Sequence, residues 1–561
     1  MKKNNKGITL IALIVTIIVL LILAGITVAS LSGDNGLIDK TSEAQFRTEI
    51  AQYQEDLDLS IIKEEGKNKR GRTNKFNATS YDDIKKIIPS FHKKYENSLV
   101  IEEDKLVYKG NNKNLYKLSL DMGLISSEDL LDDEILEELQ PFITEWTVSA
   151  NDTITLPIGG TCDFTVDYGD GTEVKITNQR DSNKSHTYTN TGTYTVTIKG
   201  KCTNFSTNNC DCRDKLTKIV QWGSTGFSGG LQFLGCTNLK GPIPTPSKNS
   251  LKNVTSMYQL FYNCTSLDGE IPEKLFYNCN KVTRFTNAFN GCKNLTGNIP
   301  ENLFKDCTEV TEINNAFYGC SGLTGNIPED LLKNCTKITN VRELFWSCSG
   351  LTGNIPPNLF MNNKEISNFY GTFSNCSSIT GEISENLFKS CTKASNFQNT
   401  FNNCRGLTGV IPEKLFSNSS SLITSFNSTF KSCSNLTGTI SEGLFENCIE
   451  ATDMGSVFHG CSKLEGNIPE NLFKDCTKIT NARETFSGCY GLTGSIPENL
   501  FQNNTQINNF YGTFSGCTKL SGNAPELWNR TNVTTSTYCF RNCKNLLNYN
   551  QIPSSWGGGG E

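Results

Sequence analysis

One segment of about 28 residues recurs through more than half of the chain, and it constrains the fold more than any other feature. Each copy contains Phe-x-x-Cys, with Leu or Ile three residues after the cysteine. The anchor cysteines are Cys236, Cys264, Cys292, Cys320, Cys348, Cys376, Cys404, Cys433, Cys461, Cys489, Cys517 and Cys543. A fixed period of this length predicts a solenoid of stacked coils.

A single copy of the repeat carries too few apolar residues to close a core alone. Between Cys292 and Phe317 they are Leu295, Ile299, Leu303, Phe304, Cys307, Val310 and Ile313. Each coil must therefore bury its apolar side against its neighbours. Pro300 ends any extended segment within the copy, because proline lacks a backbone donor and restricts the residue before it.

A second column of small residues lies midway between the anchors. It is occupied by Cys279, Cys307, Cys335, Cys391, Cys448 and Cys476, and in other copies by Asn363, Ser419 and Asn504. Asparagine cannot replace a disulfide partner, whereas a small buried side chain that bonds to the next backbone can be Cys, Asn or Ser. We therefore expect ladders of buried free thiols in both columns. Disulfides between coils are the alternative, because strands about 4.8 Å apart bring cysteines within bridging range.

The repeats resemble a known family. Residues 253–257 (Asn-Val-Thr-Ser-Met), followed by 260–267 (Leu-Phe-Tyr-Asn-Cys-Thr-Ser-Leu), are similar to BspA-like leucine-rich repeats of bacterial surface proteins. Residues 323–328 (Leu-Thr-Gly-Asn-Ile-Pro) also resemble a segment of plant-type leucine-rich repeats. The resemblance implies a parallel-stranded α/β solenoid used for adhesion or ligand binding, and it names no ligand.

The start of the chain carries a second strong signal. Residues 1–7 are a short basic leader, and residues 8–31 form an uncharged apolar run of 24 residues. This run is long enough to span a bilayer as a helix, with the lysines inside. A plain signal-anchor helix and a cleaved secretory signal are alternative interpretations.

The same segment resembles a type IV prepilin signal. Its leader ends at Gly7, and the resemblance implies cleavage between Gly7 and Ile8, with a long helix at 8–65 retained in the protein. The fifth residue after that cut is usually Glu in pilins but is Ala12 here. This departure favours a minor pilin or a membrane-tethered pseudopilin over a major filament subunit.

The next segment predicts a small α+β head at 66–125. A helix is expected at 81–88, and the two apolar stretches at 99–101 and 106–108 predict a hairpin. An acidic linker follows at 126–141.

From residue 142 to 202 the hydrophobic period changes to two, which predicts strands. The motifs Phe-x-Val-Asp-Tyr-Gly-Asp-Gly at 164–171 and His-x-Tyr at 186–188 resemble a PKD-type immunoglobulin-like sandwich. The aspartates do not have the spacing of a calcium loop, so we expect a hairpin turn and no metal. A disulfide between Cys162 and Cys202 and two free thiols are both compatible with the sequence.

One catalytic pattern occurs, Gly-x-Ser-x-Gly at 226–230. A nucleophile elbow needs a buried strand before it, a helix after it, and Asp and His downstream. Here the only later histidine is His459, inside a repeat. We expect a turn at this point, no enzyme activity and no cofactor.

Variable positions of the repeat predict a binding surface. Twenty-two residues after each anchor, and two residues before it, the occupant changes from copy to copy and is often aromatic or arginine. Such residues carry binding energy when exposed. The candidates are Tyr258, Arg342, Trp346, Tyr370, Arg483 and Tyr511. The alternative is that these side chains pack sideways on neighbouring coils.

The expected fold is multidomain. Its parts are a leader at 1–7, a pilin-like helix at 8–65 with a transmembrane part at 8–31, a head at 66–125, a linker at 126–141, a β-sandwich at 142–202, a lead-in at 203–232, repeats at 233–556 and a tail at 557–561.

The expected function is that of a bacterial cell-surface adhesin that binds an extracellular protein or glycan. It would be anchored in the membrane, with its C-terminal part outside. The alternative is a minor pilin or pseudopilin that decorates a type IV filament or secretion system and contacts its subunits. A net charge of -5 argues against nucleic acid as a partner.

Overall fold

The computed structural model describes residues 99–102, 105–108 and 140–560. The chain divides into two compact units, Met1–Leu136 and Glu137–Glu561. In the first unit, β1 (Leu99–Glu102) pairs antiparallel with β2 (Lys105–Tyr108), as the hairpin expectation predicted. The expected prepilin cleavage site at Gly7 and Ile8, the helix at 8–65 with its transmembrane part, the helix at 81–88 and most of the acidic linker lie outside the described residues.

The second unit begins with β-strands. These are β3 (Phe142–Val148), β4 (Thr153–Thr155), β5 (Ile158–Asp167), β6 (Glu173–Ile176), β7 (Ser185–Thr187), β8 (Gly192–Ser206), β9 (Leu216–Gln221) and β10 (Leu231–Gln232). One sheet has the order β6-β5-β8-β3-β9, with β10 on β8, and β4 pairs with β7 in a second sheet. Side chains of β3 alternate between buried and more exposed, which is why the period of two predicted strands here. The sheet continues beyond residue 202 through β9 and β10.

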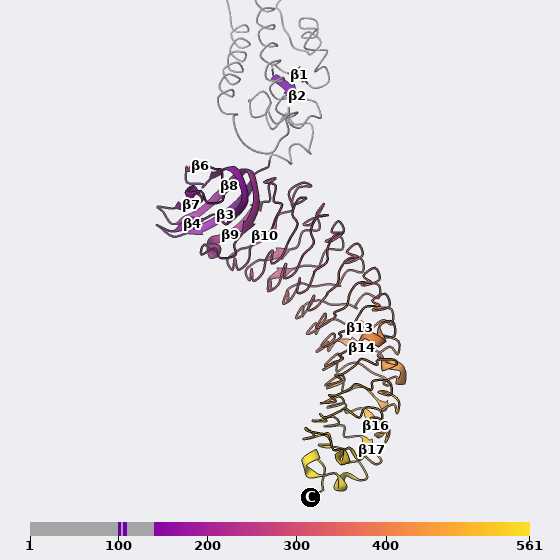
Figure 1. Ribbon diagram of the computed structural model, residues 1–561. Coiled ribbons are helices and arrows are strands. Elements are labelled where there is room, and N and C mark those ends of the chain that lie inside the picture. Colours follow the sequence, from indigo (N-terminus) through magenta and orange to yellow (C-terminus); the bar gives the residue numbers. More distant parts are fainter. Residues whose placement is uncertain (1–98, 103–104, 109–139, 561) are drawn as a thin grey trace, which may run out of the picture. The chain divides into compact units, whose positions relative to one another are not determined.

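Parallel ladders join the coils of the repeat region (Figure 1). The first ladder is a row of isolated bridges that links Ser256, Arg284, Glu312 and Asn340, and continues to Thr535. We call the surface along this row the bridged face. A second ladder contains short parallel strands: β11 (Gly269–Glu270), β12 (Leu295–Thr296), β13 (Gly381–Glu382), β14 (Leu407–Thr408), β15 (Gly466–Asn467), β16 (Leu492–Ser495) and β17 (Leu520–Ser521). The stacking that the repeat period predicted is therefore present.

The expected α/β fold class is wrong for this solenoid. Within the described ranges there is no α-helix; the helical turns are 3₁₀, at η2 (Ser182–Lys184), η3 (Arg213–Lys215), η4 (Ser420–Leu422), η5 (Glu442–Phe445), η6 (Leu527–Asn529), η7 (Tyr549–Gln551) and η8 (Ser554–Trp556). Nor does any helix in this part of the chain have the length and apolarity to cross a membrane.

The physical reason lies in the short return segment of each coil. Leu303 N–H donates to the carbonyl of Pro300 at 3.2 Å, and Cys307 N–H donates to the carbonyl of Phe304 at 3.0 Å. These bonds close turns of three residues, whereas an α-helix needs bonds between residues four apart. Too few residues separate the proline from the cysteine for a helix to propagate.

A column of phenylalanines forms the centre of the solenoid. Phe317 stacks on Phe289 at 5.5 Å and on Phe345 at 5.8 Å between ring centroids, and the same contact recurs from Phe233 to Phe540. Trp222, just after β9, packs on Phe233 at 5.9 Å. The sandwich and the solenoid therefore share one continuous core.

Candidate ligand-binding face

The anchor cysteines lie beside the phenylalanine column as free, buried thiols. The thiol of Cys348 donates to the carbonyl of Phe317, one coil earlier, at 2.9 Å. The same bond recurs at 3.0–3.1 Å for Cys264, Cys292, Cys320, Cys376, Cys404, Cys433, Cys461, Cys489, Cys517 and Cys543. Burial raises the pKa of the Cys404 thiol to about 12, so the ladder stays protonated and supplies hydrogen-bond donors.

The second column also donates to backbone carbonyls of the previous coil, and its thiols make looser contacts than those of the anchor column. Cys335 donates to the carbonyl of Cys307 at 3.3 Å, whereas Asn363 Nδ2 donates to the carbonyls of Cys335 at 2.8 Å and Leu332 at 3.2 Å. Asn504 makes the equivalent pair of bonds, at 2.7 and 3.0 Å. The structure thus shows a physical basis for the alternation of Cys and Asn, because both present a donor to the previous coil.

Asparagines on the bridged face direct the variable side chains. Asn340 Oδ1 accepts the backbone N–H of Arg342 at 2.9 Å, and Asn368 Oδ1 accepts that of Tyr370 at 2.9 Å. The same turn precedes Gln398, Arg483 and Tyr511. This side-chain-to-backbone bond is the Asx turn, and it sets the direction of the residue that follows.

Three of the predicted residues, Arg342, Trp346 and Tyr370, meet Tyr318 in one group. We call these four residues the central aromatic cluster. Trp346 stacks between Tyr318 and Tyr370, each at 6.1 Å between ring centroids. The Arg342 guanidinium lies over the Tyr370 ring at 4.5 Å and bonds to Glu343 at 3.2 Å. Gly371 has a φ of 58° and lies so close to Trp346 that a Cβ there would collide with the indole.

The other three predicted residues lie apart from this cluster. Arg284 covers Tyr258 at 4.8 Å towards the start of the solenoid, and Arg483 covers Tyr511 at 4.9 Å towards its end. Tyr511 also contacts Tyr538 edge-on at 5.8 Å. The sideways packing that was the alternative interpretation is therefore real. It leaves Arg342 and Arg483 exposed and the rings half-buried.

Sequence reasoning missed some members of these groups. Tyr318 lies in the column two residues before the anchor but is not among the predicted residues, and Arg284 and Glu343 lie outside the two variable columns. Arg284 lies 26 residues after Tyr258, two positions short of one repeat. A search for pairs offset by nearly one repeat would have found it.

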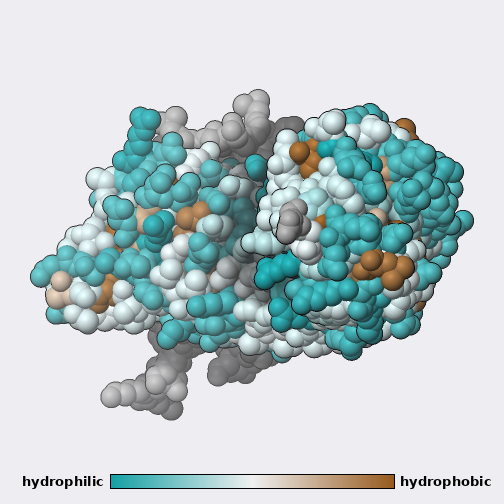
Figure 2. All heavy atoms as spheres, turned by 90° about the horizontal axis from the view of Figure 1, so that it is seen from below, coloured by the Kyte–Doolittle hydropathy of each residue, from teal (hydrophilic) through white to brown (hydrophobic). Residues whose placement is uncertain are grey.

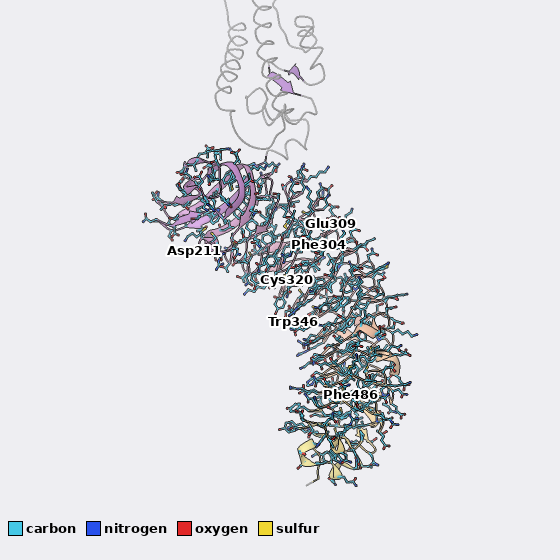
Figure 3. All side chains as sticks on the ribbon, in the orientation of Figure 1. Asp211, Phe304, Glu309, Cys320, Trp346 and Phe486 are labelled. Carbon is cyan, nitrogen blue, oxygen red and sulfur yellow. The ribbon has the colours of Figure 1, made fainter. Side chains whose placement is uncertain are left out.

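Much of the remaining surface is polar. On the face seen in Figure 2, apolar residues are isolated spots in a hydrophilic surface. Figure 3 shows Trp346 at one margin of the stack of coils.

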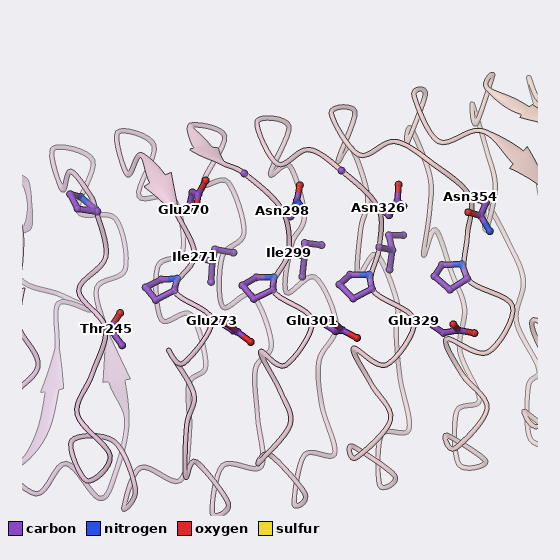
Figure 4. Close-up of a pocket in the computed structure, with 18 of the residues that line it drawn as sticks. Thr245, Glu270, Ile271, Glu273, Asn298, Ile299, Glu301, Asn326, Glu329 and Asn354 are labelled. Atoms are coloured by element: carbon purple, nitrogen blue, oxygen red, sulfur yellow. The ribbon is translucent and has the colours of Figure 1, made fainter.

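A groove of about 1220 Å³ runs across several coils elsewhere on the solenoid (Figure 4). Its floor is a row of Ile-Pro pairs such as Ile299 and Pro300, and glutamates line it. Two of these glutamates accept bonds from asparagines of the next coil: Asn302 Nδ2 donates to Glu273 at 3.1 Å, and Asn358 Nδ2 donates to Glu329 at 2.6 Å. Sequence reasoning missed this groove, although the repeated Ile-Pro-Glu is its signal.

The aspartates of the sandwich hold a turn. Asp170 accepts the backbone N–H of Thr172 at 3.0 Å and bonds to His186 Nε2 at 2.7 Å. Burial would raise the pKa of Asp170, but the bonds from His186 and Thr172 outweigh it and lower the pKa. His186 stacks on Tyr168 at 4.4 Å. In the described part of the chain, no three metal-ligating side chains come together.

Ser228, from the Gly-x-Ser-x-Gly pattern, is exposed between β9 and β10. Its carbonyl accepts the hydroxyl of Thr255 at 3.0 Å, and its N–H donates to the carbonyl of Thr203. The segment is an irregular connection into the first coil and does not have the strand-turn-helix geometry of a nucleophile elbow.

Stacked parallel coils with a repeating leucine and phenylalanine core define a leucine-rich-repeat type of solenoid. The family described as "Mycoplasma protein of unknown function, DUF285" matches residues 231–358, 311–443, 396–521 and 424–556. These segments together cover more than half of the chain, which therefore belongs to this family.

Among solved structures, the chain is similar to the Arabidopsis receptor kinase HAESA in complex with the peptide hormone IDA and the co-receptor SERK1. The identity is 17%, the TM-score is 0.27, and the match covers 56% of this chain and 64% of HAESA, less than two thirds of its length. It is also similar to TLR13 in a complex with ssRNA13, at 13% identity and a TM-score of 0.13, with 52% of each chain covered. No curated protein matches the chain. The prepilin-like and PKD-type resemblances stay predictions.

Proposed function

We propose that this protein is an adhesin whose solenoid binds an extracellular protein or glycan through the bridged face. The central aromatic cluster is the observation that supports this proposal most directly. Trp, Tyr and Arg are the residues that most often dominate binding energy. Here they are held in a fixed arrangement by Asx turns, so little conformational entropy is lost when a partner binds.

The proposal assigns the protein a binding role and no catalytic step. Display on the outer surface of a bacterium is part of it, and rests on the apolar residues 8–31 of the sequence. Polar Asn, Thr and Ser side chains over the coils suit a surface exposed to solvent.

The test uses the compact unit Glu137–Glu561. It is titrated against extracellular-matrix proteins, mucins and cell-wall glycans immobilised on a biosensor. Trp346→Ala and Tyr370→Ala are expected to weaken binding at least about tenfold, the usual effect of truncating a dominant contact residue. Gln398→Ala is the matched control, because Gln398 occupies the same column one coil beyond Tyr370 and follows the same turn.

Equal loss of binding in the control and in Trp346→Ala would contradict the assignment of the cluster. Absence of saturable binding to every panel member would contradict the adhesin role. Recovery of the protein with sheared filaments would then favour the filament-associated alternative. Thermal unfolding of each variant, measured first, shows that the substitutions leave the fold intact.

A further inference from the structure

Two of the cysteines outside both repeat columns lie in the connection from β8 to β9. Cys210 is half-buried, and it is the only one of the 23 cysteines that is not buried. The Cys212 thiol points at the carbonyl of Thr155 at 3.3 Å, and the Cys210 thiol points at the same oxygen at 3.7 Å. A shared acceptor places the two sulfur atoms on the same side of the connection, next to each other.

The surroundings of this pair are open to solvent. A hollow of about 710 Å³ is lined by both cysteines together with Lys184 and Lys215. A second hollow of about 660 Å³ reaches Cys210 from the first coil. Asp211, between the two cysteines, is exposed and is labelled in Figure 3. A small thiol or disulfide compound therefore has access to Cys210 from either hollow.

The two thiols also differ from the repeat thiols in their chemistry. A hydrogen bond from the Cys210 thiol lowers the pKa of Cys212 to about 7, and the same bond raises the pKa of Cys210. In the repeats, by contrast, burial alone raises the pKa of Cys335 to about 12. The reactive form of cysteine is the thiolate, so the pair has a nucleophile near neutral pH, unlike a buried repeat thiol such as that of Cys335.

We propose that Cys210 and Cys212 form a reversible dithiol–disulfide site that exchanges with external disulfide compounds. One sulfur of the pair attacks the external disulfide, forms a mixed disulfide and releases the first external thiolate. The second sulfur loses its proton and displaces the other external thiolate. One protein S–S bond forms, one external S–S bond breaks, and two electrons pass from the protein to the external compound.

The site lies where the sandwich joins the repeats. Thr207, at the start of the same connection, donates its hydroxyl to the carbonyl of Leu234 at 2.9 Å. Asn238 in the first coil donates to the carbonyl of Asp214 at 2.8 Å. Closing a disulfide between residues two apart reshapes this connection, because such a small ring restricts the backbone between the cysteines.

The test uses the full chain, reduced and then equilibrated with mixtures of reduced and oxidised glutathione. Free thiols are trapped with an alkylating reagent, and the peptides are mapped by mass spectrometry. The expected result is a Cys210–Cys212 disulfide that forms with oxidised glutathione and reopens with reduced glutathione. Before oxidation, the pair should react with a chromogenic disulfide at least about 100-fold faster than the repeat thiols, given the difference in pKa and nucleophilicity.

Substituted variants test whether the reaction belongs to these two cysteines. Cys210→Ser and Cys212→Ser should each abolish the internal disulfide and leave a stable mixed disulfide with glutathione on the remaining sulfur. Cys162→Ser is the matched control, because Cys162 faces Cys202 across β5 and β8 but both side chains are buried. This variant should keep the same number of thiols that react rapidly with the chromogenic disulfide. A pair that stays reduced in excess oxidised glutathione, or fast thiols that map to other cysteines, would overturn the proposal. Both readouts come from the unsubstituted chain, so they do not depend on the folding of any variant.

Discussion

The same substitution in the two cysteine columns should have different effects on stability. In the second column, Cys335→Asn introduces the amide that Asn363 and Asn504 carry at the equivalent position of other coils. Its acceptors would be the carbonyls of Cys307 and Phe304, which lie 3.3 and 3.8 Å from the Cys335 sulfur. The new amide gains hydrogen bonds through its nitrogen. It also buries its oxygen without a hydrogen-bond partner, which is the situation of Asn363 Oδ1. These effects nearly cancel, so we expect a change of about 1 kcal/mol or less in the free energy of unfolding.

In the anchor column the outcome should be worse. Cys348 already lies 2.9 Å from the carbonyl of Phe317 and is fully buried against the phenylalanine column. Cys348→Asn adds atoms where there is no space, which costs about 1–3 kcal/mol, and buries an amide oxygen without a partner, which costs about 1–3 kcal/mol more. The expected destabilisation is therefore about 2–6 kcal/mol.

Urea unfolding of the unit Glu137–Glu561, followed by tryptophan fluorescence, compares the two variants. Because repeat proteins can unfold in parts, amide hydrogen exchange in the coils around each site accompanies the urea curves. Equal midpoints for the two variants, or a greater loss in Cys335→Asn, would refute the assignment of tight packing to the anchor column and looser packing to the second.

Three further changes test other parts of the structure. Phe345→Ala breaks the ring column and should cost about 3–5 kcal/mol in urea unfolding, whereas Thr352→Ala, at an exposed position of the same coil, should cost under about 0.5 kcal/mol. Gly488→Ala forces a side chain into a backbone with a φ of 73° and should lower stability by about 1–2 kcal/mol, while Gly230→Ala, with open space and no positive φ, tests for a general effect of alanine. Burial lowers the pKa of His459, so the unfolded chain binds the proton more readily and stability should fall as pH drops below about 6.5. His459→Gln should flatten this pH dependence in thermal melts between about pH 5 and 7. An unchanged pH dependence in the variant would contradict the assignment.

The stacked architecture could be predicted from the sequence because a coil with few apolar residues has no other way to bury them. Some copies carry Asn, at 363 and 504, at the position that Cys335 holds in its own copy. This alternation also indicated hydrogen-bonding ladders, since Cys and Asn share only their small size and a hydrogen-bond donor. In the sandwich, the period of two from residue 142 to 202 predicted strands, but it missed β9, because Leu216–Gln221 was assigned to the lead-in.

The α-helices expected from the α/β class are absent from the described solenoid for a local reason. The Pro-Glu-x-Leu-Phe pattern suits a helix start, but the return segment ends after about two turns at the cysteine and adopts bonds between residues three apart. The residue types at the start of the segment do not show this limit, because a helix also needs enough residues before the cysteine to propagate.

The sequence by itself determined the period, the stacking direction of the coils and the identity of the columns, since these follow from spacing along one chain. Only the tertiary structure decided which variable residues meet. Trp346 and Tyr370 are 24 residues apart and touch because neighbouring coils are stacked in register, whereas Tyr258 and Tyr511 share a column with Tyr370 but lie in distant coils. The juxtaposition of Cys210 and Cys212 over one carbonyl likewise depends on how the connection folds against β4. Contacts between separate coils and strands are set by three-dimensional packing, which single-chain spacing does not specify.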